Sequence, residues 1–180
     1  MSKRILLLLF VIVYLACPGA KAQEGGPPKE KWTNRLITGG GIGLQFGDYT
    51  YVQITPILGY RVTDKFHAGI GLNYTYYKYN DKYYNYKYET SIYGGSIWTR
   101  YFIIENLFAE ATYEVLNMDV PGPNNELVRD NIPVLMVGGG YAQSIGGQSM
   151  LLLRVLWDVI EDPYSPYANP IFSVGFSVGL

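Results

Sequence analysis

The final stretch, Pro170-Ile-Phe-Ser-Val-Gly-Phe-Ser-Val-Gly-Leu180, decides the fold class. Every second residue from Phe172 to Leu180 is apolar, and the residues between them are only Ser and Gly. Successive side chains of a β-strand point to opposite faces, so this segment has one apolar face and one face of small residues. A strand that crosses a membrane within a barrel needs about 9–11 residues. The stretch therefore predicts a membrane-spanning β-strand.

Further segments with strand character fill most of the chain. They lie at residues 36–46, 51–62, 66–76, 88–102, 107–115, 132–143 and 151–159. Their content of glycine and β-branched residues is too high for stable helices. Glycine runs at 94–95 and 138–140 leave open which residues of 88–102 and 132–143 share a face. With the final stretch, these segments predict an all-β chain of eight strands.

The second face of these strands indicates what surrounds them. Most readable segments carry Gly, Ser and Thr there, with isolated Arg and Glu, whereas a soluble protein normally exposes many Lys and Glu. Small residues fit the narrow interior of an eight-stranded barrel, and closure pairs every backbone group without an edge. We therefore expect an eight-stranded antiparallel up-and-down transmembrane β-barrel with a side-chain-filled lumen. A soluble, lipocalin-like cup is the alternative.

Average hydropathy does not argue against a membrane barrel. The mean hydropathy is +0.03, but lipid-facing and interior residues of a barrel alternate and cancel in any window. The connections also alternate in length. Residues 63–65, 103–106 and 144–148 form tight turns, whereas 80–87, 117–131 and 160–169 are expected to be long loops. Short turns on one side and long loops on the other are typical of outer-membrane barrels.

The N-terminal region has the features of a secretory signal peptide. Lys3 and Arg4 precede an apolar run at 5–16, and Ala20-Lys-Ala22 is a small-x-small cleavage site. The run is too short for a transmembrane helix of roughly 20 residues. Lipoprotein processing at Cys17, the only cysteine, is the alternative. We expect a signal peptide at 1–22, a periplasmic lead-in at 23–35 and a barrel at 36–180 in the cell outer membrane.

Charged residues on the small-residue faces are expected to point into the lumen. A buried charge is costly unless it is paired, so we predict that Arg100 and Arg154 meet Glu110 and Glu114 across the barrel. Such pairs would brace the barrel, and a proton or solute path is the alternative. The expected lumen charge network consists of Arg61, Arg100, Glu110, Glu114, Arg154 and Asp158.

Half of the 18 tyrosines surround one expected loop. Exposed tyrosine is a favoured binding residue, so Tyr79, Tyr83, Tyr84 and Tyr86 are candidates for a surface-interaction loop. The alternative is a long hairpin in which tyrosines pack across the two strands. Other aromatic residues are expected to mark the two membrane boundaries, where rings with polar tips are favoured. These are Tyr60, Phe66 and Tyr101 on the short-turn side, and Phe46, Tyr76, Trp157 and Phe172 on the other.

Several kinds of chemistry are not expected. The formal net charge of −1 gives no electrostatic reason to bind nucleic acid. His67 is the only histidine, and the sequence contains no metal-ligand spacing and no nucleotide-binding motif. A hydrolytic site of the Ser-His-acid type would need His67, which we place inside the barrel beside a tight turn. We expect no catalytic residues, no metal and no cofactor.

With its strands laid out, the chain resembles the small eight-stranded OmpA/OmpX-type barrels of Gram-negative outer membranes, and most of all the OmpX-like, porin-family members of Bacteroidota. Leu180 departs from the terminal Phe or Trp usual in that family. The residues that carry the resemblance are Trp98-Thr-Arg-Tyr-Phe102, Leu107-Phe-Ala-Glu-Ala111, Gly139-Gly-Tyr-Ala142 and Phe176-Ser-Val-Gly-Leu180.

The resemblance implies insertion by periplasmic chaperones and the outer-membrane assembly machinery. It implies no single activity. We expect a monomer surrounded by outer-membrane lipid, with a structural or surface-interaction role carried by its extracellular loops toward an unidentified extracellular partner. The alternative is a narrow channel or a barrel that binds a small ligand or acts as an adhesin.

Overall fold

The computed structural model describes residues 32–45, 49–81, 86–122 and 126–180. A short 3₁₀ helix, η1 (Trp32–Arg35), precedes the first strand. No helix in these ranges is long and apolar enough to cross a membrane. The eight strands are β1 (Leu36–Gln45), β2 (Tyr49–Arg61), β3 (Phe66–Asp81), β4 (Tyr86–Phe102), β5 (Leu107–Pro121), β6 (Leu127–Gly146), β7 (Ser149–Asp158) and β8 (Ile171–Gly179).

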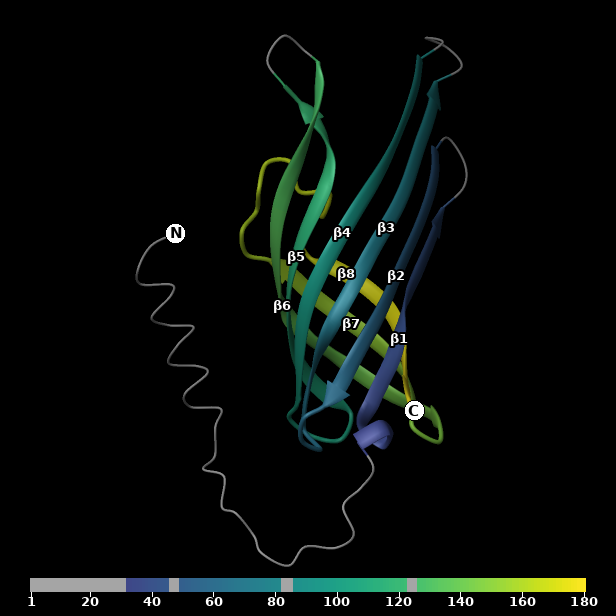
Figure 1. Ribbon diagram of the computed structural model, residues 1–180, viewed down its shortest axis with the longest axis vertical. Coiled ribbons are helices and arrows are strands. Elements are labelled where there is room, and N and C mark those ends of the chain that lie inside the picture. Colours follow the sequence, from purple (N-terminus) through teal and green to yellow (C-terminus); the bar gives the residue numbers. More distant parts are fainter. Residues whose placement is uncertain (1–31, 46–48, 82–85, 123–125) are drawn as a thin grey trace, which may run out of the picture. The chain divides into compact units, whose positions relative to one another are not determined.

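The strands form a closed antiparallel barrel in sequence order (Figure 1). Each strand pairs with the next, and β8 returns to β1 to close the wall. The prediction of an all-β, eight-stranded, up-and-down antiparallel barrel is therefore confirmed. The C-terminus lies at the same end of the barrel as η1 (Figure 1).

The apolar faces identified from the sequence point out of the barrel. On β8, Phe172, Val174 and Phe176 are exposed, whereas Gly175 and Ser177 are buried.

The structure also shows which residues share a face in the two segments that the sequence left open, 88–102 and 132–143. In β4 the even-numbered residues face the lumen, so Trp98 and Arg100 are buried while Ile97 is exposed. In β6 the even-numbered Ile132, Val134 and Met136 face the lumen in the same way.

Strands extend into two of the expected long loops. Residues 117–131 were expected to be a loop, but β5 continues to Pro121 and β6 begins at Leu127. The polar residues of this region pair across the ribbon: Asp119 lies opposite Arg129 at an ion-pair distance of 2.9 Å. Cross-strand pairs of this kind help to stabilise an antiparallel ribbon. Polar composition was therefore misread as a loop signal.

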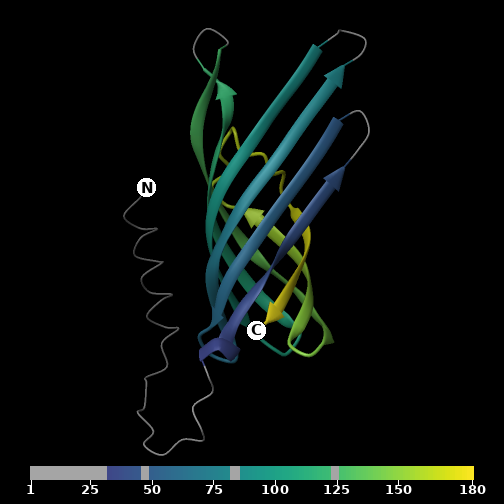
Figure 2. The ribbon, with the colours of Figure 1, turned by 45° about the vertical axis from the view of Figure 1, so that its right-hand side comes forward.

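The hairpin of β3 and β4 is also longer than expected. A loop was predicted at 80–87, but β3 continues to Asp81 and β4 starts at Tyr86, and residues 82–85 lie outside the described ranges. The β3–β4 and β5–β6 hairpins rise above the β7–β8 side of the barrel (Figure 2). The third expected long loop is a real connection, since residues 159–170 contain no strand.

The core lies inside the barrel, in two apolar clusters. Toward the long hairpins, residues of β4 to β7 pack together: Ile92, Leu116, Val120, Ile132, Val134, Met136 and Leu156. Toward the short turns, Phe102, Phe108, Ala142 and Leu152 form a second cluster. These large interior residues come from β4 to β7, whereas the interior faces of β1, β2, β3 and β8 are rich in Gly, Ser and Thr.

Candidate functional site

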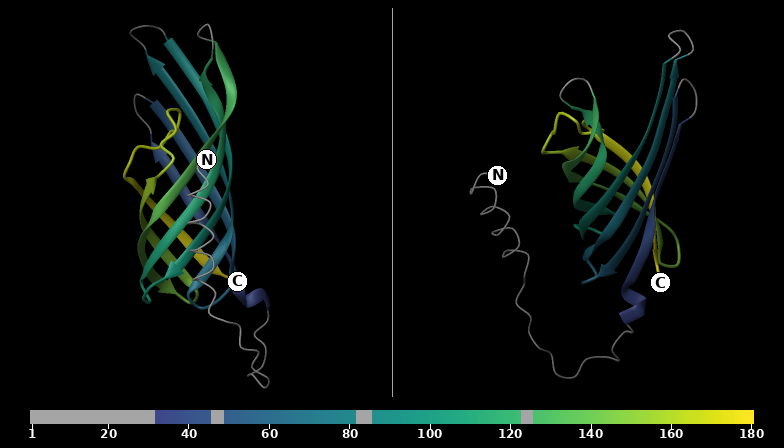
Figure 3. Two further views of the ribbon diagram at one scale, coloured as in Figure 1. Left: turned by 90° about the vertical axis from the view of Figure 1, so that its left-hand side faces the viewer. Right: turned by 45° about the horizontal axis from the view of Figure 1, so that its top comes forward.

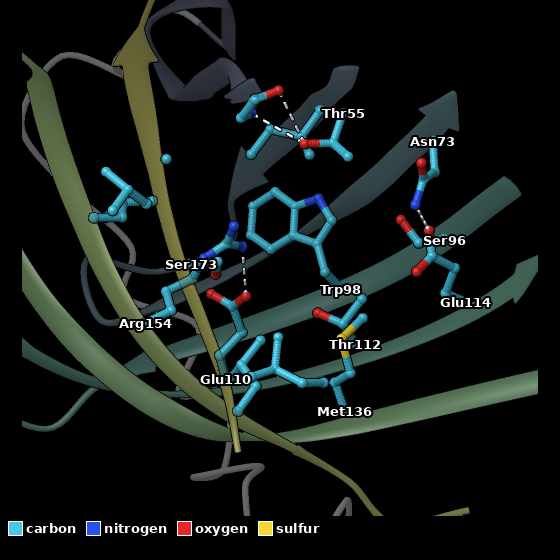
Figure 4. Close-up of a pocket in the computed structure, with 18 of the residues that line it drawn as sticks. Thr55, Asn73, Ser96, Trp98, Glu110, Thr112, Glu114, Met136, Arg154 and Ser173 are labelled. Atoms are coloured by element: carbon cyan, nitrogen blue, oxygen red, sulfur yellow. Dashed lines mark hydrogen bonds and ion pairs between the residues drawn. The ribbon is translucent and has the colours of Figure 1, made fainter. Parts of the chain in front are cut away.

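Trp98 occupies the middle of the lumen because two glycines leave space for it (Figure 4). A Cβ built on Gly59 would lie 2.5 Å from Cζ2 of Trp98, and one built on Gly69 would lie 2.7 Å from the same atom. The indole Nε1 donates a hydrogen bond to the carbonyl oxygen of Ile70 at 3.2 Å. The glycine-rich interior face of β2 and β3 thus accommodates a large side chain from β4.

A carboxylate shared by two guanidinium groups lies beside Trp98. Arg100 donates from Nε and Nη2 to Oε2 of Glu110, at 2.9 and 2.7 Å. Arg154 donates from Nη1 to Oε1 of the same carboxylate at 3.1 Å. The Arg100 guanidinium also lies over the Phe108 ring, 4.7 Å from its centroid. The predicted pairing of Arg100 and Arg154 with Glu110 is therefore present.

The predicted pairing of Glu114 with an arginine is wrong. Its Oε1 accepts a hydrogen bond from the amide of Asn73 at 2.9 Å, and its Oε2 accepts one from the hydroxyl of Tyr167 at 2.9 Å. No Lys or Arg of the described ranges forms an ion pair with this carboxylate. Tyr167 reaches into the barrel from the β7–β8 connection, and no feature of the sequence indicated that a loop residue would do so.

The other two members of the expected network lie at opposite ends of the barrel. Arg61 donates to Oε1 of Gln148 at 2.8 Å, beside the short turns. Asp158 is buried and organises the β7–β8 connection: its carboxylate accepts hydrogen bonds from the hydroxyl of Ser165 at 2.9 Å and from the backbone of Ile160 at 3.1 Å. The six charged residues are therefore not one network.

A cavity of about 530 Å³ lies between the two apolar clusters. The prediction of a side-chain-filled lumen is therefore incomplete. Figure 4 shows Glu110, Arg154 and Ser173 on one side of this lumen cavity, and Asn73 and Glu114 on the other. Its lining also includes strand residues at the junction of β1 and β8, namely Gly40, Gly41, Ile42, Gly43, Phe172, Ser173, Val174, Gly175 and Phe176.

The junction of β1 and β8 is short. Pairing covers four residue pairs, from Ile37 opposite Gly179 to Gly40 opposite Phe176. The remaining residues of β1 up to Gln45 pair only with β2. The right-hand view of Figure 3 shows β8 (yellow) beside β1 near the C-terminus and separated from it above. We call this junction the β1–β8 seam, and the lumen cavity lies against it.

The four tyrosines of the expected surface loop are only partly described. Tyr79 and Tyr86 lie on the backbone of β3 and β4, and the side chains of all four, with the whole of Tyr83 and Tyr84, lie outside the described residues. Lower on the same hairpin, aromatic residues pack across the strands. Tyr74 lies opposite Tyr93 with ring centroids 5.5 Å apart, the arrangement expected for the hairpin alternative.

Among the described residues, no group of three or more His, Cys, Asp or Glu could hold a metal ion. His67 is buried inside the barrel beside the short turns, as its sequence position suggested. Its ring packs against Phe102 at 5.0 Å between centroids.

The fold and its interior define a closed eight-stranded β-barrel with an arginine-rich ion-pair triad in the lumen. No family model and no curated protein matches the sequence. Among solved structures, the chain is similar to the N-terminal β-barrel domain of OprF from Pseudomonas aeruginosa. The two share 11% sequence identity with a TM-score of 0.43, over 80% of this chain and 94% of the OprF domain. The fold assignment rests on the strand pairing itself.

Proposed function

We propose that this chain is an integral outer-membrane β-barrel protein. The observation that carries the proposal is the apolar outer surface, on which Phe172 is 74% exposed, Leu72 66% and Ile42 65%. Monomeric soluble proteins rarely expose contiguous apolar surface beyond a few hundred Å². Here such residues recur on every strand of the wall, so lipid is the environment that suits this surface. Cleavage after Ala22 and delivery by chaperones and the assembly machinery belong to the same proposal.

The height of the apolar surface supports this location. On β3 the outward face is apolar or aromatic from Phe66 to Tyr76. Ten residue steps of about 3.4 Å, tilted by about 40°, rise about 26 Å, close to the ~25 Å apolar band of outer-membrane barrels. Tyr60 and Tyr101 are exposed near the short turns, and Trp157 is exposed near the other end. Aromatic residues at both levels suit the two membrane boundaries.

The proposed role is structural or interactive rather than conductive. An ion that crossed the barrel would have to pass both apolar clusters and the buried Arg100–Glu110 pair. Interaction with an extracellular partner would then fall to the long hairpins, including the tyrosine-rich β3–β4 connection. The protein would act as a monomer, because closure of the wall leaves no free sheet edge over most of its circumference.

Gel mobility tests the location. The full chain is expressed in a Gram-negative host, and membrane and soluble fractions are compared with and without boiling. We expect the protein in the outer-membrane fraction, with a folded form that migrates differently until it is boiled. Recovery of the folded protein in the soluble fraction without detergent would contradict the proposal. In planar bilayers we expect no steady openings, and single-channel steps would favour a narrow channel.

A second candidate function is a barrel that binds a small ligand. The lumen cavity favours it, because its volume of about 530 Å³ falls in the range of about 300–1,000 Å³ typical of ligand pockets. Deleting residues 82–87 distinguishes a ligand bound at the surface loops from one bound inside the barrel. The deletion would abolish binding of a soluble probe at the loops and leave binding inside the barrel unchanged.

A further inference from the structure

The seam gives the lumen cavity a way out through the wall. Every other junction of the wall is paired over more residues than the seam: β3 and β4 pair over sixteen residue pairs and β5 and β6 over fifteen. Beyond Gly40 and Phe176 neither β1 nor β8 has the other as a pairing partner, and the residues on both sides of this unpaired stretch line the cavity. The exit opens among exposed apolar side chains, namely Ile42 of β1 with Phe172 and Val174 of β8.

Two polar atoms at this wall lack partners. Nε of Arg154 and Oγ of Ser173 are buried without a hydrogen bond. The two residues lie directly opposite each other on β7 and β8, and both line the lumen cavity. An unsatisfied buried polar group is destabilising, so a bound water, ion or ligand is expected to complete it. The guanidinium Nε can only donate, so the missing partner is a hydrogen-bond acceptor.

The charges nearby favour a negatively charged acceptor. Arg100 and Arg154 together carry two positive charges, and both use the single carboxylate of Glu110. The triad therefore has a formal excess of one positive charge. Glu114 lies on the opposite side of the cavity, where Asn73 and Tyr167 hold it (Figure 4). An anion would be favoured beside Arg154 and Ser173, away from Glu114.

We propose that the lumen cavity binds the anionic oxygen head group of a single-chain lipid, which Arg154 and Ser173 hold while its acyl chain leaves through the β1–β8 seam into the membrane. The proposal rests on the membrane location and specifies the ligand of the second candidate function. A carboxylate and a phosphate head share the required chemistry, since both offer charged oxygen acceptors. The cavity would take the head, and the apolar residues at the seam would take the chain.

Photocrosslinking tests the proposal. The full-length barrel is inserted into phosphatidylcholine nanodiscs with palmitate that carries a diazirine in its chain, and adducts are mapped by mass spectrometry. We expect adducts at Ile42, Phe172 and Val174 to exceed those at Ile97 and Tyr113, which are exposed on the outer face of β4 and β5. A diazirine-labelled phosphatidylcholine gives the background of ordinary lipid contact. Uniform labelling around the barrel would overturn the proposal.

Matched variants identify the head-group site. Ser173→Ala removes one unpartnered hydroxyl, whereas Ser96→Ala removes a hydroxyl that lines the same cavity from β4. We expect seam labelling to fall about threefold in Ser173→Ala and about tenfold in Arg154→Gln, from the usual size of neutral and charged hydrogen bonds. Ser96→Ala should match the natural protein. Equal labelling in all three variants would overturn the assignment of Arg154 and Ser173.

Competition distinguishes the source of the anion and the need for charge. Unlabelled laurate and dodecyl phosphate should both displace the probe, whereas dodecanol should not. The stronger of the two competitors identifies the preferred head group. Displacement by dodecanol as strong as by laurate would overturn the proposal, as would covalent dimers linking two copies at the seam. Unboiled gels of the same samples separate the outcomes. If the barrel is folded and inserted but shows no seam labelling, only the lipid-binding proposal is refuted. If the barrel fails to insert, the proposed membrane location is refuted.

Discussion

The two sides of the barrel wall differ in both pairing and filling. The side built from β3 to β6 has long strands in continuous register, and large side chains from β4 to β6 provide most of the upper core. The side built from β7, β8 and β1 has shorter strands and the seam of four residue pairs, and the interior faces of β8 and β1 carry mainly glycine and serine. The lumen cavity lies against this second side. In this molecule most of the large interior side chains lie on one side of the wall, and the cavity and the unpartnered atoms of Arg154 and Ser173 lie on the other.

The largest expected effect comes from removing the shared carboxylate. Glu110→Ala would leave Arg100, whose side chain is 2% exposed, without its partner in the lumen. Breaking a buried pair from one side typically costs about 3–5 kcal/mol of unfolding free energy. Urea unfolding in lipid vesicles, followed by gel mobility, measures this. Glu89→Ala, which removes the exposed partner of Lys78 and the acceptor of the Tyr76 hydroxyl, is the control and should cost about 1 kcal/mol or less. Equal losses of unfolding free energy in the two variants would show that the buried ion pair stabilises the barrel no more than the exposed one.

A smaller loss is expected from filling the space that Trp98 uses. Gly59→Ala places a methyl group against the indole ring and should lower the unfolding free energy by about 1–3 kcal/mol, the usual cost of overpacking. In a Trp98→Phe background, where the ring is smaller, the same change should cost much less. A double-mutant cycle by urea unfolding measures the coupling. Additive losses would mean that the two residues do not compete for this space.

Hydrogen exchange compares the two sides of the wall directly. Backbone amides of Ile42 and Gly43 in β1, which pair with β2 but have no partner on the β8 side, should exchange on average at least about tenfold faster than that of Val137 in β6, which is paired on both sides. This is a difference of about 1.4 kcal/mol in opening free energy. Mass spectrometry of the barrel in nanodiscs measures the exchange. Adding palmitate should slow exchange at Ile42 and Gly43 and leave Val137 unchanged. Equal protection at both sites would mean that the seam is as firmly closed as the rest of the wall.

The smallest effect is expected in the upper ribbon of β5 and β6. Arg129→Gln removes the ion pair with Asp119 and the hydrogen bonds that Arg129 donates to the carbonyl oxygens of Ser91 and Asn117. The Arg129 side chain is 40% exposed, so solvent screens these contacts. The unfolding free energy should therefore fall by about 1 kcal/mol, and less in high salt. A loss as large as that of Glu110→Ala would show that the ribbon, and not the lumen triad, limits stability.

The sequence predicted the strands well because alternation is a local property. The period of two in the final stretch and in 51–62 or 66–76 fixes which side chains share a face, whatever the strands pair with. It predicted less well where local signals conflict. The glycines at 94–95 hid the fact that Trp98 faces inward. The polar residues around Asp119 suggested a loop, although Asp119 and Arg129 pair across a ribbon.

The sequence alone therefore determined the fold class, the outward position of the apolar residues in the strands with clear alternation, and the inward position of Glu110, Glu114 and Arg154. Only the tertiary structure decided that Glu110 takes both arginines, that Tyr167 and Asn73 hold Glu114, and that a cavity meets a short seam. The physical reason is geometric. Contacts across a lumen depend on the register and tilt of strands far apart in the chain, and the alternation within one strand carries no information about either.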